Sequence, residues 1–205
     1  MRIQITDLTI ENLRDRKFIQ EIPEFYQLRN VVENFPPWHY HESVFDHTLA
    51  VLEQESLILQ QIPDALRNYL RQKPFLQYSR QDLLHLSIVF HDIGKLETFV
   101  QTGEVTSCSG HEEKGAEITT RILQREFLLN SKEIKRVAEM IQHHGNFCAF
   151  SRRQNTFQEY EKLKKQFPKV FSEMILLELA DTQTLPNSNE KSWMINVYKE
   201  LLRNC

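Results

Sequence analysis

Six residues of the types that bind metals occupy comparable places along this chain. His91 and Asp92 directly follow the almost wholly apolar run LLHLSIVF. The other four are His47, His111, His144 and Asp181, each expected on the inward side of a helix or in one of its end turns. Taken singly, such a histidine is more often a core residue bonded to a carbonyl. Burying all six costs several kcal/mol, however, unless each finds a strong partner, and a divalent metal supplies one.

The donor types narrow the choice of metal. Imidazole nitrogen and carboxylate oxygen without thiolate suit Mn, Fe, Co, Ni or catalytic Zn better than a structural zinc site. Adjacent residues on a helix point about 100° apart. His91 can therefore bind one metal while Asp92, with two oxygens, bridges to a second. We expect one or two divalent transition metals (Fe, Mn, Co, Ni or Zn) as cofactors.

Helical periodicity predicts the elements that must position these residues. The expected helices span residues 24–34, 42–61, 64–71, 82–95, 109–127, 132–144, 156–166, 169–184 and 190–203, after a short helix near Asp7. Ser109 and Glu112 have the spacing of a capping box at one helix start. QTGEV at 101–105 is typical of a turn between two short strands. The prediction is an all-α bundle with at most a small β-hairpin near 99–107.

The chain shows no linker, repeat or low-complexity segment that would divide it. We therefore expect a single domain over 1–205, with a core of about 21–185 and a C-terminal helix at 190–203. Gly94, just after the apolar helix, would let a neighbouring helix approach closely.

Composition excludes several classes of protein. With 40% hydrophobic and 26% charged residues and only five glycines, the chain is an ordinary globular sequence and not a turn-rich all-β one. A net charge of −3 gives no basic field, so no stable nucleic-acid binding is expected. The three cysteines form no CxxC pair, the N-terminus is too polar for a signal peptide, and no apolar run approaches the ~20 residues of a membrane span. These features predict a cytoplasmic protein without a membrane segment.

The ordered set of residues resembles the HD-domain superfamily of all-α, metal-dependent phosphohydrolases. His47, His91-Asp92 and Asp181 match its H…HD…D signature, and His111 and His144 match the extra histidines of members that hold two metals. The segments IPEFYQL, HYHESVFDHTLAVL, HDIGKLETF, SGHEEKGAEI and ELAD are similar to the HD domain of bacterial tRNA nucleotidyltransferases. The resemblance covers roughly residues 21–185 and implies an HD-domain helical bundle.

Three departures limit what the resemblance implies. The 205 residues carry no trace of the Gly-rich, paired-Asp motif of a nucleotidyltransferase domain, so we expect a standalone HD domain and no nucleotide addition. The ED pair of guanosine-tetraphosphate hydrolases is absent after HDIGKLETF. IQHHGNF has the paired histidines of cyclic-di-GMP phosphodiesterases but lacks their GYP motif.

The resemblance also implies roles for single residues. His47, His91, Asp92 and Asp181 would hold a first metal, and His111 and His144 a second one bridged by Asp92. A water activated by the metals would attack phosphorus. Asp92 and Lys95 are thus the expected catalytic residues, with Lys95 contacting a phosphate, although a lysine favoured by a helix C-terminus is an equal alternative.

Four histidines have more than one possible place. His143 is the alternative to His144, which we prefer because it continues the Val137–Met140–Ile141 stripe. His39 and His41 precede the first ligand helix and either line a pocket or belong to a loop. His85, on the face of Asp92, is expected to support the site or the core.

The implied function is that of a phosphohydrolase for a nucleotide or another small phosphoester, either a phosphomonoesterase or a phosphodiesterase. Nucleoside monophosphates, 2′,3′-cyclic phosphates and dinucleoside polyphosphates all fit the resemblance. Two rivals share the ligand set: an HD-fold di-iron oxygenase, and a non-catalytic HD module that senses nucleotides or binds a partner.

Overall fold

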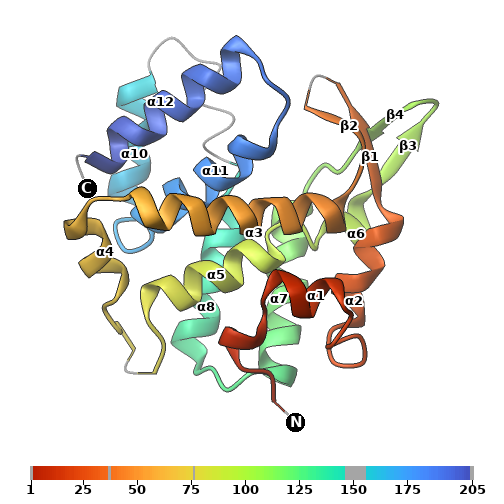
Figure 1. The fold of residues 1–205 in the computed structure, drawn as a ribbon, viewed down its shortest axis with the longest axis horizontal. Helices are drawn as coiled ribbons and strands as arrows, with labels where there is room; N and C mark the ends of the chain where they lie inside the picture. The colour runs from red at the N-terminus through yellow and green to blue at the C-terminus, as the bar shows by residue number, and fades with distance from the viewer. Residues whose placement is uncertain (1, 37, 76, 146–155, 204–205) are drawn as a thin grey trace.

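The computed structural model describes residues 2–36, 38–75, 77–145 and 156–203, and it is mainly helical (Figure 1). The helices are α1 (Ile10–Arg14), α2 (Pro23–Gln27), α3 (Val44–Gln61), α4 (Asp64–Leu70), α5 (Arg80–Phe90), α6 (Lys95–Thr98), α7 (His111–Glu126), α8 (Ser131–His143), α10 (Thr156–Gln166), α11 (Phe171–Thr184) and α12 (Asn189–Arg203). Short 3-10 helices cover Ile5–Asp7 and Leu28–Asn30. The predicted all-α class is confirmed, and no described helix is long and apolar enough to cross a membrane.

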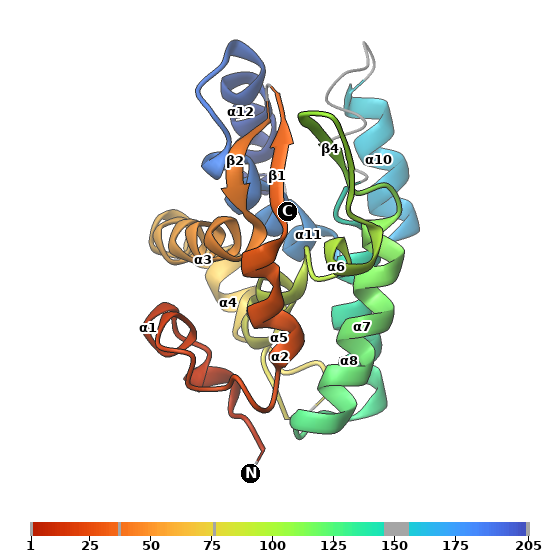
Figure 2. The ribbon, with the colours of Figure 1, turned by 90° about the vertical axis from the view of Figure 1, so that its right-hand side faces the viewer.

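Helix α5 forms the centre of the fold. Its side chains are buried around most of the circumference, including the fully buried Leu83, Leu86 and Phe90. Helices α3, α8 and α11 all pack against it, α7 covers α8, and α12 covers α11. Figure 2 shows α7 and α8 on one side and α3 on the other. Because the apolar run of α5 is held from several sides, whatever follows its last residue has a fixed position.

The predicted helix over 82–95 is wrong at its C-terminal end. Helix α5 ends at Phe90, residues 91–94 form a tight turn, and α6 begins at Lys95. The amide of Lys95 donates to the carbonyl of Asp92 (3.0 Å), three residues back. A Cβ at Gly94 would overlap the His111 carbonyl and the Gly115 amide of α7, so the expected close approach of a helix is confirmed. After Phe90 the chain therefore turns and packs against α7 and does not continue α5.

Two antiparallel hairpins stand beside each other on the same end of the molecule (Figure 2). Strands β3 (Val100–Thr102) and β4 (Val105–Ser107) form the hairpin that the sequence predicts. Strands β1 (Val32–Phe35) and β2 (His39–Ser43) were not predicted, because the expected helix over 24–34 in fact ends before β1. The Asn34 amide donates to Thr106 Oγ1 (2.8 Å), which ties β1 to β4. A long-range contact thus overrides the local helical pattern.

The helix starts differ in their capping. Asn130 and Glu133 form a capping box at α8, as Ser79 and Asp82 do at α5. The capping box predicted at Ser109 is wrong. Helix α7 follows Gly110, whose φ of 80° is left-handed, and no side chain caps it.

Candidate metal centre

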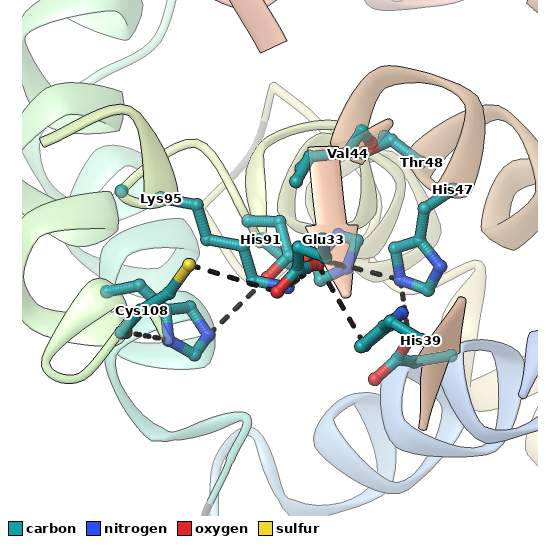
Figure 3. Close-up of polar contacts among 12 residues, drawn as sticks. Glu33, His39, Val44, His47, Thr48, His91, Lys95 and Cys108 are labelled. Carbon is teal, nitrogen blue, oxygen red and sulfur yellow. Dashed lines mark hydrogen bonds and ion pairs between the residues drawn. The ribbon is translucent and has the colours of Figure 1, made fainter. Parts of the chain in front are cut away.

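All six predicted ligand residues meet where the ends of α3, α5, α7, α8 and α11 come together. They form two groups, His47 with His91 and Asp181, and Asp92 with His111 and His144. Within each group, one ligand atom of every residue lies within 4.8 Å of the others. In the view of Figure 3, His91 lies between Lys95 on one side and His47 on the other. Segments far apart in the sequence therefore supply one compact set of donors.

Asp92 joins the two groups through its two oxygens. Oδ2 lies 3.3 Å from Nε2 of His91 and 3.7 Å from Nε2 of His47. Oδ1 lies 3.4 Å from Nε2 of His111 and 3.9 Å from Nε2 of His144. The carboxylate is almost completely buried. Each oxygen thus faces one pair of histidines, which is the arrangement that a bridging carboxylate needs.

Main-chain carbonyls fix the protons of three of these histidines. Nδ1 of His91, His111 and His144 lies 2.8, 2.9 and 2.7 Å from the carbonyl oxygens of Ile88, Cys108 and Ile141, respectively. A carbonyl can only accept, so Nδ1 carries a proton in each ring and Nε2 is the nitrogen left to face Asp92. Nε2 of His91 is buried and lies 3.3 Å from Asp92 Oδ2 without a well-aligned hydrogen bond. Burial lowers the pKa of His91, but Asp92 raises it above its usual value, which favours a proton on Nε2 when no metal is bound. Nitrogen atoms that converge on a carboxylate in this way fit a divalent cation, which would displace that proton.

His47 is held at both ring nitrogens. Nδ1 lies 3.4 Å from Thr184 Oγ1, and Nε2 lies 2.9 Å from Asp181 Oδ1, an oxygen that is buried without a well-aligned hydrogen bond. Burial lowers the pKa of His47, but Asp181 and Glu42 outweigh it and raise the pKa to about 10. Without a metal, a proton on Nε2 therefore supplies the positive charge between His47 and Asp181. A metal that bound here would have to displace that proton.

The structure separates His144 from His143. Burial and the neighbouring His111 and His91 lower the pKa of His144 to about 4. Its imidazole is therefore neutral at pH 7, the form that can bind a metal. The ring of His143 instead lies 4.4 Å from that of Phe167 and belongs to neither ligand group. This geometry favours His144 as the ligand.

Lys95 and Glu33 form a buried extension of the centre (Figure 3). The Lys95 ammonium lies 2.8 Å from Asp92 Oδ2 and 2.7 Å from Glu33 Oε2. Burial lowers the pKa of Lys95, but the two carboxylates raise it above its usual range, so the lysine is charged. Lys95 is the first residue of the four-residue helix α6 and does not end a helix over 82–95 as the alternative assumed.

Glu33 was not identified from the sequence. It lies on β1, which the predicted helix concealed, and its side chain is the buried one of that strand. The strand-like segment from Val32 to Ser43, interrupted by Pro36, was the available signal.

The remaining histidines lie in different surroundings. His39 on β2 packs its ring against that of His47, with centroids 5.2 Å apart, and lies 3.9 Å from carboxylate oxygens of both Glu33 and Glu42. His41 is exposed at a φ of 52°. His85 pairs with Glu55 and the Leu8 carbonyl, away from the six ligands.

A cavity of about 430 Å³ opens beside the centre. Its lining comes from both hairpins, the start of α7 and the α11–α12 region: Glu33, Phe35, Trp38, His39, Lys95, Thr106, Ser107, Cys108, Ser109, Gly110, His111, Glu112, Asp181, Leu185 and Met194. Its size suits a small molecule. His39 thus takes the pocket-lining place of its two alternatives.

Comparison with known proteins identifies the family. Residues 44–179 match the HD domain family. A tRNA nucleotidyltransferase of Deinococcus radiodurans, the A-adding enzyme, is 32% identical over 107 residues, which are 51% of this chain and 20% of that relative. The chain thus matches about a fifth of the relative's length, and the resemblance to tRNA nucleotidyltransferases is confirmed for this part alone. The chain belongs to the HD domain family, whose superfamily consists largely of metal-dependent phosphohydrolases.

Proposed function

We propose that this protein is a metal-dependent phosphohydrolase for a nucleotide or another small phosphoester. The observation that carries the proposal is the convergence of imidazole Nε2 atoms on the two oxygens of Asp92, with Nδ1 of three rings held by main-chain carbonyls, next to a cavity. Nε2 of His91 is buried and makes no well-aligned hydrogen bond, although it lies 3.3 Å from Asp92 Oδ2. A metal bound between these atoms would satisfy both of them.

The ligand groups suggest where metals would be held. His47, His91, Asp92 and Asp181 would hold the first, and Asp92 with His111 and His144 the second. A bound divalent metal would lower the pKa of a water ligand and neutralise charge on phosphoryl oxygens. The carbonyl contacts of the histidine Nδ1 atoms would keep the rings in their ligand orientation throughout.

Lys95 and Asp92 act together in this proposal. The ammonium lies at the wall of the cavity and remains charged because two carboxylates face it. Lys95 would contact a phosphoryl oxygen, while Glu33 keeps the ammonium beside the centre. Asp92 would hold both metals, so removal of its charge would affect both groups of ligands.

The first test is metal analysis of protein purified without chelator, followed by a phosphoester panel with Mn, Co, Ni and Fe. We expect about one or two equivalents of transition metal, and hydrolysis that a chelator abolishes and metal restores. Absence of bound metal together with no hydrolysis under any ion would contradict the proposal. Substrate-dependent oxygen uptake by iron-loaded protein would indicate the oxygenase instead, and nucleotide binding without turnover the sensor.

A further inference from the structure

A third group of metal-binding side chains lies beside the centre, and we call it the outer group. His39, Glu42 and His47 each offer one ligand atom, and these atoms lie within 4.8 Å of one another. His39 and Glu42 belong to β2, which leads directly into α3 and His47. The two imidazole rings lie edge to face, with centroids 5.2 Å apart (Figure 3). His47 is shared with the group that contains His91 and Asp181.

A bulge in β2 brings His39 and Glu42 to the same face of the hairpin. In a regular strand, residues three apart point to opposite faces. The register of β1 against β2 shifts between Glu33 and Asn34, and His41 is the residue left without a partner in the ladder. Its φ is 52°, which is uncommon for a residue other than glycine. Bulges of this kind redirect side chains and are frequent beside active sites.

The distances within the outer group suit a bound ion better than direct hydrogen bonds. Oε2 of Glu42 lies 3.9 Å from Nδ1 of His39 and 3.7 Å from Nδ1 of His47. Both distances exceed the limit of roughly 3.2 Å for a good N–H···O hydrogen bond. Two ligand atoms bound at about 2.1 Å to one tetrahedral ion are about 3.4 Å apart. A small inward shift of the side chains would therefore place all three atoms around one ion.

The outer group combines a solvent-facing carboxylate with two largely buried imidazoles. The side chain of Glu42 is 37% exposed, whereas those of His39 and His47 are 14% and 3% exposed. A cavity of about 420 Å³ opens at Glu42 and is also lined by the acidic Asp46. Nε2 of His39 lies 3.9 Å from Glu33 Oε2. A proton on that nitrogen therefore faces a carboxylate, and Nδ1 is left for a metal.

We propose that the outer group binds a further divalent cation such as Zn²⁺, held by Nδ1 of His39, the carboxylate of Glu42 and Nδ1 of His47. Two imidazoles and a carboxylate are a donor set that binds zinc. Nitrogen-rich sites of this kind bind Zn²⁺ more tightly than Mn²⁺. The site goes beyond the proposed function, because its ligands do not depend on the chemistry at Asp92.

The outer site competes with the metal centre for one imidazole. In the centre, His47 would bind through Nε2, which faces Asp92 and Asp181. Nδ1 then keeps its proton and donates to Thr184 Oγ1. A neutral imidazole presents a single lone pair, so an ion at the outer site takes His47 from the first metal. Excess metal should therefore fill one further site and lower turnover. This effect on turnover, unlike the site itself, rests on the proposed function.

Equilibrium dialysis of metal-free protein against Zn²⁺ tests the site without enzymatic activity. Beyond any tightly bound ions, we expect about one weaker equivalent in the wild type. His39→Asn and Glu42→Gln should each weaken that equivalent by about tenfold or more, because each removes a ligand. His41→Asn is the matched control, since it makes the same substitution at an exposed residue of the same strand, whose positive φ suits asparagine. The control should bind as the wild type does.

Anomalous diffraction at the zinc absorption edge would locate the weaker ion, which we expect between His39, Glu42 and His47. Unchanged zinc binding in both His39→Asn and Glu42→Gln would overturn the proposal. So would an equal loss in His41→Asn. A loss of the tightly bound ions instead of the weaker one would also overturn it, and would make His39 and Glu42 supports for the orientation of His47.

Turnover measured with rising concentrations of the metal that supports hydrolysis tests the competition. Relative to each protein's own maximum, activity should decline at high metal in the wild type and His41→Asn, and less in His39→Asn and Glu42→Gln. Zinc bound at the outer site without such a decline would contradict the sharing of His47. If no phosphoester is hydrolysed with any metal, the proposed function fails and the dialysis still decides whether the outer site exists.

Discussion

Two buried polar regions of this protein solve the same physical problem in different ways. In the first, which we call the Glu173 network, the fully buried carboxylate of Glu173 lies 2.7 Å from Arg80 and 3.7 Å from Arg136, and the Tyr69 hydroxyl donates to it (3.4 Å). Both arginines also donate to the carbonyl of Lys169. Opposite charges from the three helices α5, α8 and α11 thus pair within the protein.

The metal centre is paired in another way. Asp92 faces the Lys95 ammonium (2.8 Å) and the Nε2 atoms of four histidines, and Asp181 lies 2.9 Å from His47. Two of its buried atoms, Nε2 of His91 and Oδ1 of Asp181, make no well-aligned hydrogen bond, which is costly unless a partner is added. The difference lies in the partners: the permanent charges of two arginines surround Glu173, whereas imidazoles, which a metal can bind, surround Asp92.

Asp92→Asn should produce the largest functional effect. Replacing the bridging carboxylate by an amide removes a charge shared by both ligand groups, and we expect activity to fall by about 10³-fold or more, about 4 kcal/mol. Steady-state kinetics with saturating metal would measure the loss, and circular dichroism would check the fold. Asp64→Asn is the control, because that side chain is 95% exposed. An active Asp92→Asn enzyme would contradict the bridging role.

Glu173→Gln should lower the stability of the protein and leave metal binding and activity nearly unchanged. Removing one member of a buried ion pair leaves the two arginines without their counter-charge, and we expect the free energy of unfolding to drop by about 3 kcal/mol. Metal binding and the activity of the folded fraction should remain within about twofold of wild type, since Glu173 belongs to the other region. Denaturant titration and metal titration would measure both, with the exposed Glu53→Gln as control. Loss of metal affinity in this variant would show that the regions are coupled.

His144→Asn and His143→Asn test the boundary of the metal centre. We expect the first to weaken metal binding by about 10- to 100-fold, because it removes a donor that faces Asp92. The second should change it by less than about twofold, since His143 packs on Phe167. Metal titration followed by calorimetry would measure both. The reverse order of effects would assign the ligand to His143.

The smallest effect on stability should come from the pair of His85 and Glu55. These two side chains pair with each other, as the residues of the Glu173 network do. Burial lowers the pKa of His85, but Glu55 and the Leu8 carbonyl raise it above its ordinary value of 6.5. A group whose pKa is raised on folding stabilises the protein fully below the unfolded value and loses that contribution as pH rises through the folded value. His85→Gln should thus cost about 1 kcal/mol at pH 6 and progressively less as the pH rises.

Unfolding measured at several pH values, as the difference between wild type and His85→Gln, isolates this pair from other titrating groups. Glu55→Gln should remove the same pH dependence. A stability difference that does not change with pH would show that His85 is neutral in the folded protein.

The family and the helices that carry the candidate ligands were predictable because both follow local rules. Helical periodicity placed α3, α7, α8 and α11 within a few residues of their observed bounds. The types and order of the six candidate ligands resembled the HD-domain superfamily, and residues 44–179 match the HD domain family. Such information is contained in short segments and needs no knowledge of contacts between them.

The walls of the cavity were not predictable in the same way. Strand β1 forms where the local pattern favoured a helix, and it is fixed by contacts with β4, 70 or more residues later in the chain. The pairing of Glu33 with Lys95 therefore could not be anticipated, although the strand-like composition from Val32 to Ser43 was a signal for the strand itself. The turn at residues 91–94 likewise depends on α7 lying against Gly94.

The carbonyl contacts of the three histidines have a consequence for how this centre can change. In each case the acceptor lies three residues before the ligand, as Ile88 does for His91, and it belongs to the main chain. Side-chain substitutions nearby can therefore neither remove the acceptor nor reverse the ring. The hairpin that bears Phe35 and Trp38 lies outside these short segments. Substitutions in the hairpin could thus change substrate preference, while the main-chain carbonyl three residues earlier keeps the orientation of each histidine ring.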